Sequence, residues 1–208
     1  MRRLVLVRHA STRATRDACF GTQDGLDARG RAAAAALQGR LPKASEALAS
    51  PCPSASETAS LAGYAPVRIE PVLADCDYGA WSGRALADVE RDDPAGVASW
   101  LTEPDAAPHG GESLRALLAR VAGWLDREAD RDGLVVAAVP ASVVKAAVVH
   151  ALGAPAAAFW RLDVAPAAVT ELHGRAGRWT VTRVNDAVGV TCSPPRHVQV
   201  SPVQPSRS

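Results

Sequence analysis

The sequence predicts an α/β fold, a three-layer sandwich with a mostly parallel central sheet. Short apolar runs alternate with segments of helical periodicity along most of the 208 residues. Two runs, residues 4–7 and 134–139, are apolar at every position, which is typical of strands covered on both faces. We expect residues 1–189 to form one domain and residues 190–208, rich in Ser, Pro and Gln, to form a poorly ordered tail.

The first half of the chain alternates strand and helix signals. Residues 4–7 predict the first strand, and an Ala-rich helix follows over about residues 31–41, with Asp27 as its N-cap. The next elements are a short strand at 46–50, a helix over 54–62, an extended piece at 67–70 and a loop region that contains Gly79, Trp81 and Gly83.

The second half begins with an amphipathic helix after residues 110–113. Its apolar positions recur at helical spacing: Leu114, Leu117, Leu118, Val121, Trp124 and Leu125. A central strand at 134–139, a helix over 143–152 that ends at Gly153, and two closing strands at 168–173 and 179–184 complete the predicted order.

Composition excludes several function classes. Lys+Arg is 23 and Asp+Glu is 22, so a net charge of +1 gives no footprint for nucleic acid or an anionic membrane. No apolar run approaches the ~20 residues that span a bilayer, and residues 4–7 are too short for the apolar part of a signal peptide. Four cysteines without CxxC spacing favour free thiols in a cytoplasmic protein over zinc binding or disulfides. No metal-ligand spacing appears in the sequence, and we expect neither a metal nor a cofactor.

Arg8 and His9 directly follow the first strand. Ligand sites of α/β sheets lie at the carboxyl ends of the strands, so both side chains fall where a site is expected. An imidazole can accept a phosphoryl group while a neighbouring guanidinium holds the phosphate oxygens. The dipeptide by itself is also compatible with a solvated Arg-His pair beyond an edge strand.

Further motifs follow in order along the chain: an apolar strand ending in Arg8-His9-Ala10-Ser11-Thr12, then Asp24-Gly25-Leu26-Asp27 with Gly30, Ser50-Pro51 with Glu57-Thr58-Ala59, Asp75-x-Asp77-Tyr78-Gly79-x-Trp81-Ser82-Gly83, and Gly110-Gly111-Glu112-Ser113. Together these motifs resemble the histidine phosphatase superfamily, in its phosphoglycerate mutase-like branch. The resemblance covers roughly residues 3–184.

The resemblance implies a phosphohistidine intermediate on His9, phosphate binding by Arg8, and a carboxyl group at Asp75 that protonates the leaving group. The family pattern also includes a second arginine and a second histidine, and this chain has Ser54 and Pro140 at those positions. Asp75 stands where glutamate is usual and Thr15 where asparagine is usual. Removal of one charged donor to a transition state typically costs about 3 kcal/mol or more, so we expect weakened phosphate chemistry.

Other residues are candidates for the substrate side of the site. Ser11, Thr15, Arg16 and Arg84 lie in segments expected near the pocket, together with Trp81 and His109. One of the arginines, Arg13 included, is able to replace the missing guanidinium; the alternative is that they are solvated surface residues. His109 is equally compatible with a structural hydrogen bond in its loop.

Three functions remain open at this point. The first is a phosphomonoester hydrolase or phosphotransferase that uses His9. The second is a noncatalytic protein that binds a ligand or partner in the old pocket. The third is a repurposed enzyme in which His9 and Asp75, supported by Glu112, perform acid/base chemistry without phosphate. In each case the expected partner is a small molecule, phosphorylated in the first, and a homodimer is compatible with the sequence.

Overall fold

A computed structural model describes residues 1–21 and 23–187. The predicted tail, residues 190–208, lies outside the described residues, as do Cys192 and His197. The strands and α-helices run in the order β1 (Arg2–Arg8), α1 (Arg13–Arg16), α2 (Ala28–Ala35), β2 (Glu46–Ala49), α3 (Pro53–Leu61), β3 (Arg68–Ile69), α4 (Leu86–Asp92), α5 (Pro94–Thr102), α6 (Leu114–Ala129), β4 (Gly133–Val139), α7 (Ala141–Ala151), β5 (Val169–Arg175) and β6 (Arg178–Asp186). Short 3-10 helices lie at Pro71–Leu73, Gly79–Trp81 and Ala156–Arg161.

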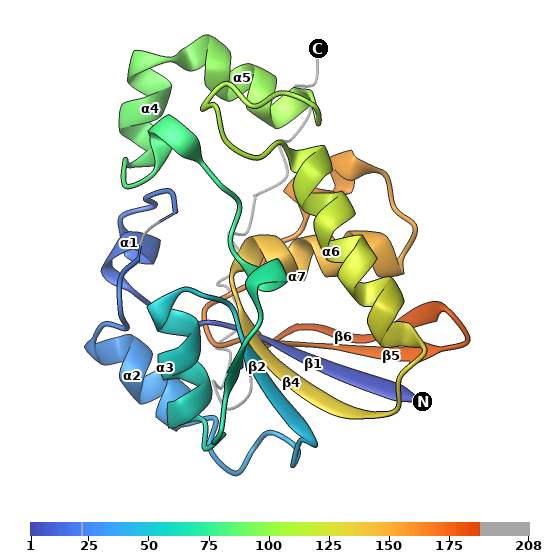
Figure 1. Ribbon diagram of the computed structural model, residues 1–208. Coiled ribbons are helices and arrows are strands. Elements are labelled where there is room, and N and C mark those ends of the chain that lie inside the picture. Colours follow the sequence, from blue (N-terminus) through green and yellow to red (C-terminus); the bar gives the residue numbers. More distant parts are fainter. Residues whose placement is uncertain (22, 188–208) are drawn as a thin grey trace, which may run out of the picture.

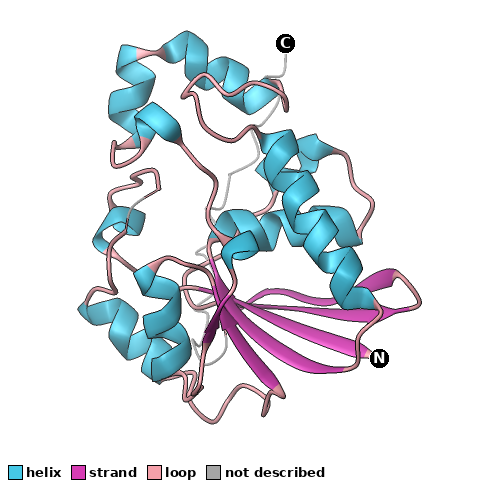
Figure 2. Ribbon diagram, viewed as in Figure 1, coloured by secondary structure: helices cyan, strands magenta, loops and turns pink. Residues whose placement is uncertain are grey.

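The six strands form one sheet in the order β3-β2-β4-β1-β5-β6. Strands β3, β2, β4 and β1 are parallel, and β5 and β6 add an antiparallel edge beside β1. Helices cover both faces of the sheet, with α6 and α7 on one face and α2 and α3 on the other (Figures 1 and 2). The predicted mostly parallel α/β sandwich is confirmed.

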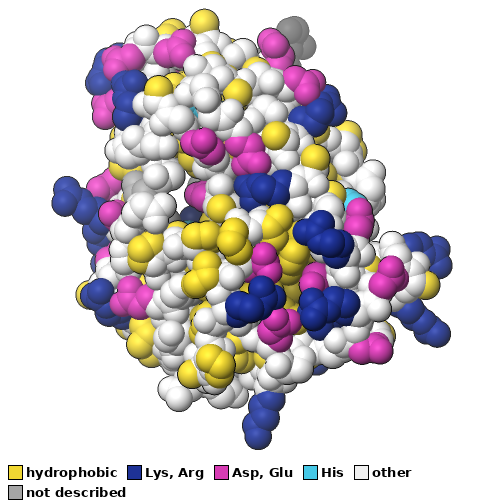
Figure 3. Space-filling model, viewed as in Figure 1, with side chains coloured by type: hydrophobic (Ala, Val, Ile, Leu, Met, Phe, Trp, Pro, Cys, Tyr) yellow, Lys and Arg dark blue, Asp and Glu magenta, His cyan; other side chains and the backbone are white. Residues whose placement is uncertain are grey.

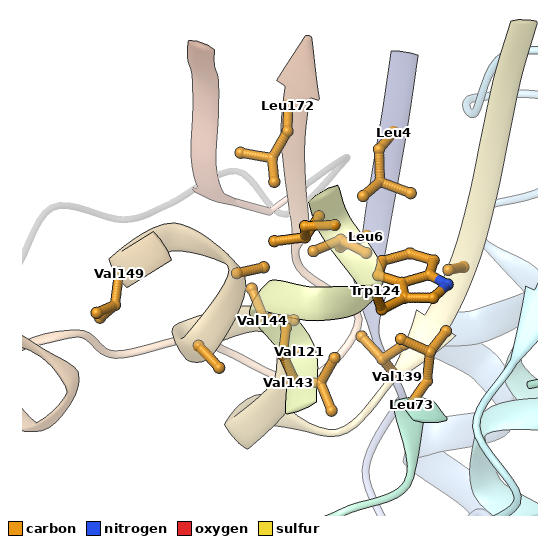
Figure 4. Close-up of a cluster of buried hydrophobic side chains, with 14 of the residues drawn as sticks. Leu4, Leu6, Leu73, Val121, Trp124, Val139, Val143, Val144, Val149 and Leu172 are labelled. Atoms are coloured by element: carbon orange, nitrogen blue, oxygen red, sulfur yellow. The ribbon is translucent and has the colours of Figure 1, made fainter. Parts of the chain in front are cut away.

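The alternation of β1 side chains builds a core on each face of the sheet. Leu4 and Leu6 pack under α6 and α7, together with Trp124 and Val144 (Figure 4). Val5 and Val7 belong to a separate cluster on the other face. Because successive strand residues point to opposite faces, an unbroken apolar run is the sequence of a strand buried on both sides.

Two parts of the predicted order need correction. The first helix begins at Ala28 and ends at Ala35, whereas the sequence placed it over residues 31–41. Asp27 caps it by accepting a hydrogen bond from the Gly30 N–H at 2.7 Å, so the helix starts directly after the cap, and a chain reversal through Gly39, at a φ of 73°, replaces its expected last turn. The region after Gly83 also contains two helices, α4 and α5, that the sequence pattern did not predict.

Helices α4 and α5 lie away from the sheet, above its carboxyl edge (Figure 1). Val89 of α4 and Val97 of α5 form a small separate core with Phe20 and Trp81. Trp100 of α5 contacts Trp160 edge-to-face at 4.5 Å between ring centroids, which joins this layer to the segment before β5. In the described part of the chain, no helix is both long enough and apolar enough to span a membrane.

Candidate active site

A cavity of about 270 Å³ opens at the carboxyl edge of the sheet. Three adjacent strand ends contribute to its wall: His9 follows β1, Pro140 follows β4, and Pro51 and Cys52 follow β2. The register places Arg8 beside Val139, so the residues after each strand emerge side by side. The His9 N–H donates to the Val139 carbonyl at 2.9 Å, which fixes the backbone at this point.

The His9 ring is held in one orientation and one tautomer. Its Nδ1 lies 3.0 Å from the Ala10 carbonyl oxygen, and because that oxygen only accepts, Nδ1 carries the proton. The other ring nitrogen, Nε2, then keeps its lone pair, and His9 lines the cavity. Burial lowers the pKa of His9, with a smaller contribution from the positive charge of Arg8, so the ring favours its neutral, nucleophilic form.

Asp75 lines the same cavity and is fixed through one of its two carboxyl oxygens. Oδ1 accepts hydrogen bonds from the Ser142 hydroxyl and from the Cys76 N–H, the latter at 2.8 Å. Oδ2 therefore remains free to carry a proton. Burial raises the pKa of Asp75 above its ordinary value, against the opposing effect of the two hydrogen bonds, and the carboxyl group is suited to act as an acid.

The backbone that carries Asp75 is held from behind by Arg120 of α6. The Arg120 guanidinium donates to Glu112 at 2.8 and 2.7 Å, and to the carbonyls of Val72 and Ala74 at 2.5 and 3.1 Å. A longer bond of 3.4 Å reaches the Asp75 carbonyl. Glu112, expected as a supporting residue, thus contacts the site through Arg120.

Arg8 lies next to His9 in sequence but does not line the cavity. It shares the face of the sheet that carries Leu4 and Leu6, and its guanidinium donates to the Val164 carbonyl. Burial lowers its pKa, while the charges of Asp163 and Asp75 oppose this effect. The Arg8 Nε is buried and has no hydrogen-bond partner among the described residues.

Ser54 and Pro140 both line the cavity beside His9. Ser54 lies in the first turn of α3, and its hydroxyl contacts the Cys52 sulfur at 3.4 Å. Pro140 is the N-cap residue of α7. Helices α3 and α7 therefore both begin at the cavity, and neither N-cap residue makes a side-chain capping bond, which leaves backbone N–H groups for an anion.

The structure brings only one predicted substrate-side residue, Thr15, into the cavity wall. Ser11 donates to Asp27 at 2.9 Å, and Arg16 pairs with the same carboxylate at 3.5 Å. Arg84 pairs with Asp92. Over much of the face in Figure 3, Lys and Arg side chains lie beside Asp and Glu side chains.

Trp81 and His109 are not among the residues that line the cavity. Both are buried, and their ring centroids lie 5.0 Å apart in the aromatic cluster beneath α4 and α5. His109 Nδ1 accepts a hydrogen bond from the Gly111 N–H at 3.0 Å, and burial lowers its pKa. The structural hydrogen bond considered for His109 is therefore present.

Several cavity residues were not expected from the sequence. Thr12, Gln23, Tyr78 and Ser82 line the wall, and so do the three described cysteines Cys19, Cys52 and Cys76, all of them free thiols. Burial raises the pKa of Cys76 to about 12, so this thiol remains protonated. The described cavity wall holds two acidic side chains, Asp75 and Asp77, and no Lys or Arg. Within residues 1–21 and 23–187, no group of three or more metal-ligating side chains is assembled.

Comparison with curated proteins gives relatives that match part of this chain. A bifunctional protein of Mycobacterium tuberculosis is 31% identical over 133 residues, which is 60% of this chain and 36% of that protein. Phosphoserine phosphatase 1 of Hydrogenobacter thermophilus is 27% identical over 123 residues, 58% of this chain and 56% of its own length. The chain thus spans about a third to a half of the length of these relatives.

Solved structures match more of the chain. A mycobacterial glucosyl-3-phosphoglycerate phosphatase is 26% identical with a TM-score of 0.79, covering 89% of this chain and 100% of the other. A protein of Thermus thermophilus is 31% identical with a TM-score of 0.69, covering 86% of this chain and 96% of the other. The family model described as histidine phosphatase superfamily (branch 1) matches residues 4–187, which are nearly all of the described residues. The chain therefore belongs to the histidine phosphatase superfamily, branch 1.

Proposed function

We propose that this protein is a phosphomonoester hydrolase of low turnover that works through a phosphohistidine on His9. The observation that carries the proposal is the hydrogen bond of His9 Nδ1 to the Ala10 carbonyl, because it leaves the lone pair on Nε2 of a side chain that lines the same cavity as Asp75. A nucleophile and an acid at one small cavity are the minimum that phosphoryl transfer needs.

The reaction runs in two steps. Nε2 of His9 attacks phosphorus, the bond from phosphorus to the ester oxygen breaks, and Asp75 gives its Oδ2 proton to the departing alcohol. Water then attacks the phosphohistidine, Asp75 takes up a proton from it, and phosphate leaves as Nε2 recovers its lone pair. The neutral His9 and protonated Asp75 that burial favours are the two forms that the first step requires.

Weak phosphate binding is expected because Ser54 and Pro140 stand where the family pattern has a second arginine and a second histidine. Arg8 does not line the cavity, and the donors that the described wall offers an anion are the N–H groups at the starts of α3 and α7. A helix N-terminus is equivalent to about half a charge, so it replaces only part of a guanidinium. Each lost donor lowers the rate about a hundredfold or more.

The experiment measures phosphate release and a trapped phosphoryl adduct. The protein is incubated with small phosphomonoesters and quenched, and the adduct is tested for lability in acid and stability in base. We expect His9→Ala to abolish both signals, while His150→Ala, a histidine paired with Asp126 on the surface, retains them. Turnover that is unchanged in His9→Ala would sink the proposal.

Restoration of the missing donors tests the cause of the low turnover. Pro140 has a φ of −65° and a ψ of 161°, which any residue adopts, so Pro140→His is compatible with the backbone. We expect Ser54→Arg and Pro140→His together to raise kcat/KM by about a hundredfold or more. No gain in a folded double variant would show that the two positions do not limit the rate.

The second candidate is a repurposed enzyme that uses His9 and Asp75 without phosphate. The observation that favours it is the described cavity wall, which has acidic, hydroxyl and thiol groups but no Lys or Arg. In that case neither phosphate release nor an adduct is expected from any ester. The ligand would remain a small molecule under both candidates, and the cytoplasmic location stays a prediction.

A further inference from the structure

One part of the cavity wall faces the phosphoryl group in the proposed reaction, and another part is left to contact the alcohol portion of the substrate. His9, Ser54 and Pro140 lie at the strand ends, where the phosphoryl group is bound in the proposed reaction. The wall on the α1 and Gly79–Trp81 side is formed by other residues: Thr15, Gln23, Asp77, Tyr78 and Ser82. Of these five residues Asp77 is charged, and the other four side chains carry uncharged hydroxyl or amide groups.

The arginines near these wall segments pair with carboxylates outside the cavity wall. Arg13 pairs with Asp17 at 3.4 Å, Arg16 with Asp27 at 3.5 Å, and Arg84 with Asp92. None of these three arginines is among the residues that line the cavity. The described wall therefore offers a carboxylate in the leaving group no cationic partner and places Asp77 nearby.

We infer that the substrate is a phosphomonoester of a small, uncharged polar alcohol rather than of a hydroxy acid. This inference rests on the proposed function and adds its substrate class. The cavity volume of about 270 Å³ limits the alcohol to a compact one. The lining hydroxyl groups and the Gln23 amide are suited to hydrogen bonds with alcohol hydroxyls.

A matched pair of esters tests the inference. Glycerol 3-phosphate and 3-phosphoglycerate have the same phosphate and a similar carbon chain, and they differ in whether one end is a hydroxymethyl group or a carboxylate. We expect kcat/KM to be at least about tenfold higher for glycerol 3-phosphate, since like charges at a partly enclosed site repel. Equal values, or a preference for 3-phosphoglycerate, would overturn the inference.

A charge introduced at the wall should reverse the discrimination. Ser82 is exposed and lines the cavity, so Ser82→Lys adds a cation beside the leaving group. We expect the ratio of kcat/KM for 3-phosphoglycerate over glycerol 3-phosphate to rise about tenfold. Ser60→Lys makes the same change of charge at an exposed residue of α3 that is not part of the cavity wall, and it should leave the ratio unchanged. An equal rise in both variants would overturn the role of the wall.

Failure of the proposed function is distinguishable from failure of this inference. If neither ester is hydrolysed, the phosphatase proposal fails, and the same two esters are compared as intact ligands by titration calorimetry on the full chain. Tighter binding of glycerol 3-phosphate would still support the uncharged-alcohol preference. Equal binding, tighter binding of 3-phosphoglycerate, or binding of neither ester would overturn it.

Discussion

Replacement of Arg120 by methionine tests whether the support behind Asp75 is energetically important. The guanidinium contacts both carboxyl oxygens of Glu112 and the carbonyls of Val72, Ala74 and Asp75. The Arg120 and Glu112 side chains are 24% and 17% exposed. Methionine preserves much of the apolar stem but leaves the Glu112 carboxylate and the carbonyls without their donor.

The magnitude follows from this partial burial. Breaking a fully buried ion pair typically costs about 3–5 kcal/mol, and an exposed pair contributes about 0–1 kcal/mol. Because both side chains of this pair are mostly buried and three carbonyls also lose a donor, we expect Arg120→Met to lower the free energy of unfolding by about 2–4 kcal/mol. We also expect kcat to fall, since the segment that positions Asp75 loosens.

Equilibrium unfolding in urea measures the change, with a control on the same helix. Arg115 of α6 pairs with Asp105, and these side chains are 62% and 70% exposed. Arg115→Met should therefore change the free energy of unfolding by less than about 1 kcal/mol. If Arg120→Met and Arg115→Met gave equal, small changes at the same urea dependence, the reasoning about the buried pair would be refuted. If the double variant Arg120→Met with Glu112→Leu recovered part of the lost free energy of unfolding, this would support the reasoning, because the unpaired Glu112 carboxylate is then removed.

Three further results are expected. Turnover needs neutral His9 and protonated Asp75, and burial lowers the pKa of His9 and raises the pKa of Asp75. The acidic limb of the kcat/KM pH profile should therefore lie below the ordinary histidine pKa, and the alkaline limb above the ordinary aspartate pKa. The reverse displacement of either limb would contradict these assignments. Ser142→Ala removes a donor to Asp75 Oδ1 and should slow hydrolysis of an alkyl phosphate more than that of p-nitrophenyl phosphate, whose alcohol departs without a proton. Ser142→Thr should restore the rate with the alkyl phosphate. Equal slowing with both esters would count against a role of Ser142 through Asp75. Leu117 of α6 is 1% exposed, so Leu117→Ala leaves a cavity in the core and should lower the free energy of unfolding, measured with urea, by about 2–5 kcal/mol. A loss below about 1 kcal/mol would mean that the surrounding core fills the cavity.

Much of the fold could be read from local pattern. Residues 4–7 and 134–139 are apolar at every position, and they became the neighbouring strands β1 and β4 at the centre of the sheet. The helix after Ser113 was expected because its apolar residues recur on one face, and Ser113 caps it by accepting from the Ala116 N–H. Helices α4 and α5 were missed because they are short and bury few side chains, so their periodicity is weak.

The sequence by itself predicted the strands of the parallel sheet, the helices that cover it and the position of His9 directly after a strand, and Asp75 was expected at the site from the family resemblance. The predictions made from the residues depend on near neighbours in the chain: an apolar run, a cap, a polar residue where a strand stops. It could not determine where the charged side chains point. Arg16 and Arg84 were candidates for the cavity, and the tertiary structure pairs them with Asp27 and Asp92.

The tertiary structure also decided how the two reacting groups are held. Ser142 and Arg120, 67 and 45 residues from Asp75 in sequence, are the groups that fix its carboxyl oxygen and its backbone. A long side chain has many rotamers of similar energy, and partners brought together by packing select among them. The strand pattern therefore sets where the site lies, while contacts between distant segments set its charge and geometry.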